Sequence, residues 1–276
     1  MMDEMLRTNS LTLGFKDRIV IDELDLDIPK GKVTILVGAN GCGKSTLLRS
    51  IARLLKPKSG SIELDGLDMD QLSTKEIAKR LAVLPQSTSS PEGLTVSQLV
   101  KQGRYPHQTL LKQWSVEDEE IVNEAMTSTG VFEMADRPVT SLSGGQRQRV
   151  WIAMTLAQRT ETLLLDEPTT FLDVAHQIEI LDLCHMLNEV EGKTIVIVLH
   201  DLNLAARYAH HMIALKNKTI YAQGSPEEVV TTEMMKQVFA LDCEVIEDPI
   251  TLTPMTIPYS KKAARRVKES LCIIEA

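Results

Sequence analysis

The chain has 276 residues, which is enough to bury one substantial hydrophobic core. Hydrophobic residues make up 43% of it and charged residues 25%, the ordinary balance of a globular protein. The net charge of −8 argues against a dedicated nucleic-acid binder, whose surface would be basic, so we expect no nucleic-acid partner.

The amino-terminal residues alternate between apolar and polar in the manner of β-strands. Residues 10–13 and 19–21 are expected to form short strands, joined by a polar turn at 16–18. Between Leu24 and Ile28, apolar residues alternate with acidic residues, so this segment should expose one face. The pattern predicts an antiparallel β subdomain at the amino terminus.

Residues 33–37 are apolar apart from one threonine, which is typical of a strand buried on both faces. A glycine-rich loop follows, and then leucine and isoleucine recur at helical spacing over 45–55. Residues 162–165 and 194–199 are two further buried-strand candidates, each followed by a helical pattern, at 174–190 and 202–209. Alternating strands and helices predict an α/β core with a largely parallel sheet.

The region 90–149 has no buried-strand pattern and is expected to be a mostly helical insertion, with one helix at 114–130. No apolar run approaches the roughly 20 residues that a membrane-spanning helix needs, and the amino terminus lacks a signal peptide. The four cysteines have no metal-ligand spacing and are expected to be reduced thiols: Cys42, Cys184, Cys243 and Cys272. The tail from Lys261 is basic, and we interpret it as a solvated terminal segment rather than a membrane-binding one.

Residues 38–45 have the sequence GANGCGKS, which matches the phosphate-loop pattern without gaps. Glycines let successive backbone N–H groups point at phosphate oxygens, and the following helix adds its positive amino-terminal end. The strand-to-helix setting favours a nucleotide site over a plain turn. Lys44 would bind the β- and γ-phosphates, and the Ser45 hydroxyl would bind Mg²⁺. We expect nucleotide contacts from Gly38, Ala39, Asn40, Gly41, Cys42, Gly43, Lys44, Ser45 and Thr46.

Polar residues follow both of the later buried strands, at the sheet edge where ligands of α/β proteins bind. Asp166 is placed to hold Mg²⁺, and Glu167 is placed to orient or deprotonate the attacking water as general base. A solvent-exposed strand end would also tolerate these two carboxylates, so their assignment depends on the phosphate loop upstream. His200 ends the next strand, where it either supports the structure or contacts charge developing on the γ-phosphate.

Residues 142–146, LSGGQ, precede a helical pattern at 146–157. Ser143 can simply cap that helix, or the glycines can form a second anion site at the helix start. Because the chain already has a phosphate loop, a second phosphate site would face the nucleotide of another subunit.

Together GANGCGKST, LSGGQ, LLLDEPTTFLD and His200 resemble the nucleotide-binding subunit of ABC transporters, over about Leu6 to Leu241. The resemblance implies a phosphate-loop NTPase (RecA-like) core, with an ATPase domain at 4–241 and a short extension at 242–276. It also implies ATP hydrolysis with Mg²⁺ as cofactor. In this family two subunits pair head to tail around two ATP molecules, which implies contacts to the opposite subunit's ATP from Ser143, Gly144, Gly145, Gln146 and Asp173.

The same resemblance implies roles for two more residues. Gln86 would touch Mg²⁺ and couple the ATPase to the membrane domain, and Phe15 would stack on adenine, where tyrosine is more usual. Thr170 is a departure, because many relatives have serine at that position.

Residues 103–107, GRYPH, and 169–177, TTFLDVAHQ, resemble the subset of the family that drives iron–siderophore and vitamin B12 uptake. This implies a homodimer at the cytoplasmic face of the membrane, with a transmembrane permease and an extracytoplasmic substrate-binding protein. GRYPH would lie near the permease, or be a plain loop turned by Pro106. Import of cobalamin or heme, an exporter, and a soluble ABC ATPase such as an iron–sulfur assembly protein remain alternatives.

Overall fold

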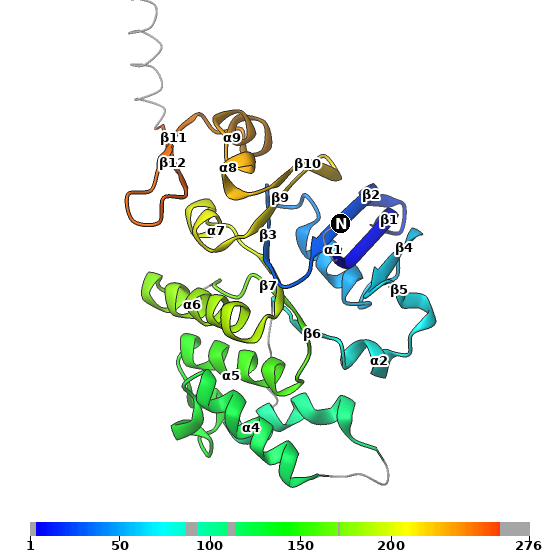
Figure 1. The fold of residues 1–276 in the computed structure, drawn as a ribbon, viewed down its shortest axis with the longest axis vertical. Coiled ribbons are helices and arrows are strands. Elements are labelled where there is room, and N and C mark those ends of the chain that lie inside the picture. The colour runs from blue at the N-terminus through cyan, green and yellow to red at the C-terminus, as the bar shows by residue number, and fades with distance from the viewer. Residues whose placement is uncertain (1–3, 87–92, 110–113, 171, 260–276) are drawn as a thin grey trace, which may run out of the picture.

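The structure is a computed structural model that describes residues 4–86, 93–109, 114–170 and 172–259. A central sheet is flanked by an amino-terminal antiparallel sheet and by a group of helices that extends to the bottom of the view in Figure 1. Cys272 and the basic tail from Lys261 lie outside the described residues, as do residues 90–92 and 110–113 of the predicted insertion and residue 171 of the 169–177 string.

The central sheet has the strand order β10-β9-β3-β8-β7-β6. All neighbours are parallel except β9 and β10. The strands are β3 (Val33–Gly38), β6 (Leu81–Leu84), β7 (Thr162–Asp166), β8 (Thr194–Val198), β9 (His211–Lys216) and β10 (Thr219–Gly224). Every residue of β3, β7 and β8 is buried, which confirms the three strands expected from continuous apolar patterns.

The amino-terminal sheet has the order β2-β1-β4-β5, with antiparallel neighbours. Its strands are β1 (Glu4–Phe15), β2 (Arg18–Pro29), β4 (Ser59–Leu64) and β5 (Leu67–Asp68). The alternation along β2 is confirmed, since Leu24, Leu26 and Ile28 are buried and the acidic residues between them are exposed. The turn is shorter than predicted, because Arg18 already pairs with Phe15 across the two strands.

Helices cover the central sheet and continue into the carboxyl-terminal part: α1 (Lys44–Ile51), α2 (Thr74–Ala78), α6 (Val174–Glu191), α7 (Leu202–Tyr208), α8 (Pro226–Val229) and α9 (Thr232–Phe239). A short 3₁₀ helix at Met69–Gln71 precedes α2. The first helix was predicted to reach residue 55, but it ends at Ile51. Arg53 has a φ of 57°, a left-handed conformation that a continuing α-helix does not allow.

The predicted helical insertion is confirmed as a three-helix subdomain of α3 (Val96–Lys101), α4 (Val116–Ser128) and α5 (Gly144–Ala157). Short 3₁₀ helices at Gln102–His107, Phe132–Met134 and Val139–Ser141 connect them. Valine, leucine and alanine side chains from all three helices join the cluster that also packs one face of the central sheet.

The GRYPH string is not a plain loop but a 3₁₀ helix that packs on α5. A Cβ added to Gly103 would lie 2.2 Å from the Met154 carbonyl oxygen, so only glycine fits there. The Arg104 guanidinium is buried and donates to Asp118 Oδ1 at 2.8 Å and to the Ala157 carbonyl at 2.9 Å. Tyr105, by contrast, is 66% exposed. Part of the string therefore holds the subdomain together, and Tyr105 faces outward.

A β-hairpin formed by β11 (Cys243–Glu247) and β12 (Pro254–Pro258) lies in the predicted extension. The Asn203 side chain, from α7, bonds both backbone groups of Thr256: its Oδ1 accepts from the N–H at 2.8 Å, and its Nδ2 donates to the carbonyl at 3.2 Å. The Thr256 hydroxyl also donates to that Oδ1, at 2.9 Å. Arg207 adds an ion pair with Asp248 at 2.7 Å. These contacts fasten the hairpin to α7.

We expect Asn203→Ala to loosen the hairpin, at a cost of about 1–3 kcal/mol, because the buried Thr256 backbone groups lose their partners. Faster hydrogen exchange of the hairpin amides would show this. Thr256→Val is the matched variant, since it removes only the hydroxyl bond and should have a smaller effect. Equal exchange in Asn203→Ala and the unaltered protein would contradict the prediction.

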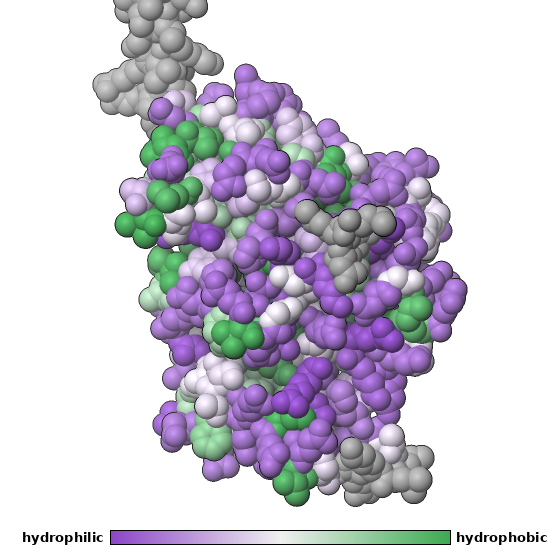
Figure 2. All heavy atoms as spheres, viewed as in Figure 1, coloured by the Kyte–Doolittle hydropathy of each residue, from purple (hydrophilic) through white to green (hydrophobic). Residues whose placement is uncertain are grey.

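In Figure 2 the surface is mostly hydrophilic, with hydrophobic residues in small separate groups. Among the described helices, none combines the length and the apolar character needed to cross a bilayer.

Cys42, Cys184 and Cys243 are free thiols, as predicted for the three cysteines in the described ranges. Burial raises the pKa of Cys184 to about 12, so this thiol is a core residue of low reactivity.

Candidate functional site

The loop between β3 and α1 depends on glycines with positive φ. Gly38 and Gly43 have φ of 148° and 112°, and a Cβ on either would collide, with the Leu215 carbonyl at 2.5 Å or with Ile21 Cδ1 at 2.7 Å. Gly41 has a φ of 77°, and a Cβ added to it would meet no atom of the described residues within 4 Å. The Lys44 Nζ is buried and donates to the carbonyls of Gly38 at 2.8 Å and Ala39 at 3.3 Å. The predicted strand, loop and helix are therefore all present.

Ser45 and Asp166 meet at the mouth of this loop. Ser45 Oγ donates to Asp166 Oδ1 at 2.9 Å, although the two residues are 121 positions apart in the sequence. Burial raises the pKa of Asp166, and the neighbouring Glu167 charge raises it further, while the Ser45 hydrogen bond opposes both. A hydroxyl and a carboxylate are the hard oxygen donors that Mg²⁺ prefers, so this pair fits the predicted Mg²⁺ ligands.

No group of three or more His, Cys, Asp or Glu side chains that could hold a metal occurs in the described ranges. A cation at the Ser45–Asp166 pair would therefore need further oxygen ligands from a bound phosphate or water. This is how phosphate-loop enzymes hold Mg²⁺.

Glu167 collects three hydrogen-bond donors from three parts of the chain. Its Oε1 accepts from His200 Nε2 at 2.6 Å, and its Oε2 accepts from Gln86 Nε2 at 2.7 Å and Thr170 Oγ1 at 3.1 Å. Burial opposes ionisation, but the bonds from His200, Gln86 and Thr170 outweigh it and lower the pKa of Glu167. The carboxylate is thus held ionised at neutral pH, as a general base requires.

The Glu167 backbone is also unusual, with a φ of 53° in a residue that is not glycine. Such left-handed conformations are unfavourable and are concentrated at functional sites, where the surrounding structure holds them in place. Here the strained residue is the predicted general base.

Gln86, which follows β6, was predicted to touch Mg²⁺. The structure places its amide on Glu167, and in the described part no hydrogen bond joins it to Ser45 or Asp166. The contact between Gln86 and Glu167 and the contact between Thr170 and Glu167 were not predicted. In the sequence, the only indication of the first contact is that Gln86 is a polar residue close after a strand. The only indication of the second is that Thr170 is a polar residue close after Glu167.

The LSGGQ string begins α5, and Ser143 caps this helix as the simpler interpretation predicted. Its side chain accepts from the Gln146 N–H, and the Gln146 side chain accepts from the Ser143 N–H at 3.1 Å. Ser143 and Gly144 are exposed, whereas Gly145 is buried against His176, which a Cβ would approach to 2.6 Å. Asp173 caps α6 and bonds the His176 ring at 2.7 Å.

Gly145, Asp173 and His176 thus lie together where α5 and α6 begin. In the described ranges, no hydrogen bond joins Ser143, Gln146 or Asp173 to the phosphate loop of the same chain. Their predicted contacts to an opposite subunit's ATP therefore stay a prediction.

A cavity of about 410 Å³ adjoins the phosphate loop, with Ala39, Asn40, Gly41 and Cys42 on one side. Arg18, the strand partner of Phe15, also lines it. Phe15 itself is half exposed at the end of β1 and does not line this cavity, so its predicted adenine contact remains a prediction.

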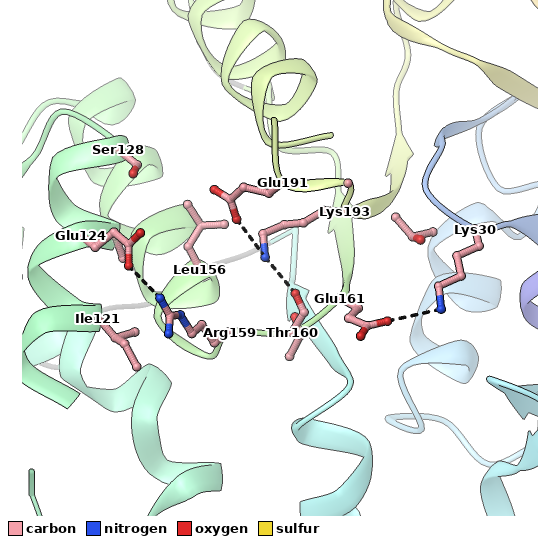
Figure 3. Close-up of a pocket in the computed structure, with 13 residues that line it drawn as sticks. Lys30, Ile121, Glu124, Ser128, Leu156, Arg159, Thr160, Glu161, Glu191 and Lys193 are labelled. Atoms are coloured by element: carbon pink, nitrogen blue, oxygen red, sulfur yellow. Dashed lines mark hydrogen bonds and ion pairs between the residues drawn. The ribbon is translucent and has the colours of Figure 1, made fainter. Parts of the chain in front are cut away.

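A second cavity, of about 510 Å³, lies where β7 and β8 begin (Figure 3). These amino ends of the strands are opposite the carboxyl ends, where the phosphate loop follows β3. Each charged side chain that lines it has a partner of opposite charge: Arg159 with Glu124, Lys193 with Glu191 and Lys30 with Glu161. The residues of the candidate site, Asp166, Glu167 and His200, lie instead at the carboxyl ends of the strands.

Comparison with known proteins agrees with this geometry. The sequence model of the ABC transporter family matches residues 21–170, more than half of the chain and the part that holds the phosphate loop, LSGGQ and Glu167. The chain belongs to the ABC transporter family. As an ABC ATPase it is the ATP-hydrolysing type of subunit, and such subunits work as dimers with transmembrane permeases in import systems.

Two curated relatives of this ABC subunit are similar over almost their whole length. "Probable siderophore transport system ATP-binding protein YusV" of Bacillus subtilis (strain 168) is 62% identical over 93% of each chain. "Petrobactin import ATP-binding protein FpuD" of Bacillus anthracis is 58% identical over 98% of each chain. Among solved structures, "An inward-facing conformation of a putative metal-chelate type ABC transporter" matches 95% of this chain and 99% of its own, at 28% identity and a TM-score of 0.82. The predicted fold class is thereby confirmed.

Proposed function

We propose that this ABC subunit hydrolyses ATP to drive import of a ferric siderophore through a separate transmembrane permease. The observation that carries the catalytic part is the convergence of His200 and Gln86 on Glu167, beside the Ser45–Asp166 pair. The two relatives are named as ATP-binding proteins of siderophore transport and of petrobactin import, and these names support a siderophore as the cargo.

In the proposed mechanism the phosphate-loop N–H groups and Lys44 bind the ATP phosphates. Ser45 and Asp166 would hold Mg²⁺, which when bound neutralises charge on the β- and γ-phosphates. Glu167 accepts a proton from the attacking water, and its ionised state at neutral pH suits that task. His200 donates through Nε2 to Glu167 and keeps the carboxylate directed at the site.

The dimer supplies the second half of each site. Ser143 and Gly144 are exposed at the start of α5, where a helix amino terminus favours an anion. We propose that they bind the γ-phosphate held by a second copy of the chain, with Asp173 at the seam. ATP then closes the pair, and hydrolysis reopens it.

The permease contact would place the subunit at the cytoplasmic face of the membrane, working with an extracytoplasmic substrate-binding protein. Tyr105 suits such a contact, because it is exposed while Gly103 and Arg104 beside it are fixed in the subdomain.

Deletion of this subunit is expected to abolish uptake of labelled ferric siderophore and to leave heme and cobalamin uptake unchanged. The measurement compares all three labelled cargoes in the deletion strain and in the strain with the subunit restored. A strain restored with Lys44→Ala tests whether uptake needs nucleotide binding rather than the presence of the protein. Loss of cobalamin or heme uptake alone would overturn the siderophore assignment, and unimpaired uptake of every cargo would overturn import.

A further inference from the structure

Residues 167–170 form a tight turn directly after β7. The Thr170 N–H donates to the Glu167 carbonyl at 3.2 Å, and Pro168 occupies the second position, which its fixed φ favours. In addition, the Thr170 hydroxyl donates to Glu167 Oε2 at 3.1 Å. Thr170 is therefore tied twice to the same residue, once through the backbone and once through the side chain.

We propose that Thr170 is a positioning residue for the Glu167 carboxylate in ATP hydrolysis. Its hydroxyl fixes Oε2, so that the carboxylate keeps one orientation toward the attacking water. The inference depends on the proposed role of Glu167 as general base.

The three donors to Glu167 differ in where they come from. Gln86 follows β6 and His200 follows β8, so both belong to other strands of the sheet. Either can separate from Glu167 when those segments shift. Thr170 belongs to the same turn as Glu167, so its hydroxyl moves with the carboxylate. It is the donor whose distance to Glu167 depends least on the rest of the protein.

A carboxylate needs such a restraint because its terminal torsion is broad and roughly two-fold. An ionised carboxylate offers about four lone-pair positions. His200, Gln86 and Thr170 occupy three of them, which leaves one direction for a water molecule. Without the Thr170 hydroxyl, Oε2 keeps a single donor and the carboxylate gains freedom to rotate away from the water.

Two substitutions separate the hydroxyl from the shape of the side chain. Thr170→Val keeps the branched shape and removes the hydroxyl, whereas Thr170→Ser keeps the hydroxyl and removes the methyl group. We expect Thr170→Val to lower kcat about tenfold, equivalent to about 1.4 kcal/mol in activation free energy, with KM for ATP within about twofold of the original. Thr170→Ser should keep kcat within about twofold.

The measurement is steady-state ATP hydrolysis by the transporter complex that carries each variant. An unchanged kcat in Thr170→Val would overturn the proposal. So would an equal loss in Thr170→Ser, because the methyl group rather than the hydroxyl would then matter.

A second comparison uses the Glu167→Gln background. If Thr170 acts through Glu167, the double variant Glu167→Gln/Thr170→Val should hydrolyse ATP no more slowly than Glu167→Gln alone. ATP-dependent dimerisation of the full chain, measured by light scattering, should also be equal in the two. Weaker dimerisation of the double variant would place Thr170 at the subunit seam and overturn the positioning role.

The two proposals fail in different ways. Full activity of Glu167→Gln would remove Glu167 as the base, and with it both proposals. An inactive Glu167→Gln together with a fully active Thr170→Val would remove only the role of Thr170.

Discussion

Replacing Glu167 with glutamine is expected to reduce ATP turnover by about 10²- to 10⁴-fold, the usual contribution of a general base. Glutamine has nearly the same shape and can still accept hydrogen bonds, but it cannot take a proton from water at neutral pH. ATP binding should persist, because the substitution leaves the phosphate loop unchanged. The Lys44 side chain in that loop donates to the Gly38 and Ala39 carbonyls and, within the described residues, has no hydrogen bond to Glu167.

The measurement pairs single-turnover hydrolysis with equilibrium binding of ATP to the same variant. Glu161→Gln is the matched control, since it makes the same charge change at the opposite sheet edge, where Glu161 pairs with Lys30. Its turnover should equal that of the unaltered protein. Undiminished hydrolysis by Glu167→Gln would show that another group activates the water.

The second large effect is on folding. Arg104→Met is expected to lower the free energy of unfolding by about 3–5 kcal/mol, because it leaves the Asp118 carboxylate buried without its ion partner. Both side chains are only 6% exposed. Burial opposes ionisation of Asp118, but bonds from Arg104 and Ser115 outweigh it and lower its pKa. Without Arg104, only the Ser115 bonds oppose burial, so the buried carboxyl loses most of what stabilises its charge.

Urea denaturation of Arg104→Met measures this loss. Arg159→Met is the matched control in the same subdomain, because it breaks the exposed pair with Glu124 and should cost no more than about 1 kcal/mol. Equal stabilities of the two variants would mean that the buried pair contributes no more than a surface pair.

The sequence predicts those elements whose local pattern is strong. β3, β7 and β8 are short, mostly apolar runs, a pattern typical of strands that are buried on both faces. β6 has only four residues, and β10 alternates between exposed and half-buried positions, so neither stands out from the surrounding sequence. β10 is positioned by pairing with β9, a tertiary contact that no short window contains.

The same limit applies to the site. Residues at the carboxyl ends of parallel strands could be predicted to meet, and two such pairs do: Asp166 with Ser45, and Glu167 with His200. The hydrogen bond from Thr170 depends on the turn after β7, and burial of Arg104 depends on Asp118 in another helix. An arginine beside tyrosine and proline indicates an exposed segment, and only its distant partner reverses that expectation.

The carboxyl-terminal hairpin bears on where the ATPase unit ends. α7 has only seven residues and begins two positions after His200. The Asn203 side chain bonds the β12 backbone as a neighbouring strand would, and Arg207 pairs with Asp248. Both contacts join residues beyond 241 to α7, the helix that follows His200. A fragment cut at residue 241 would thus lose a support of its own catalytic centre, although it would retain every motif of the family.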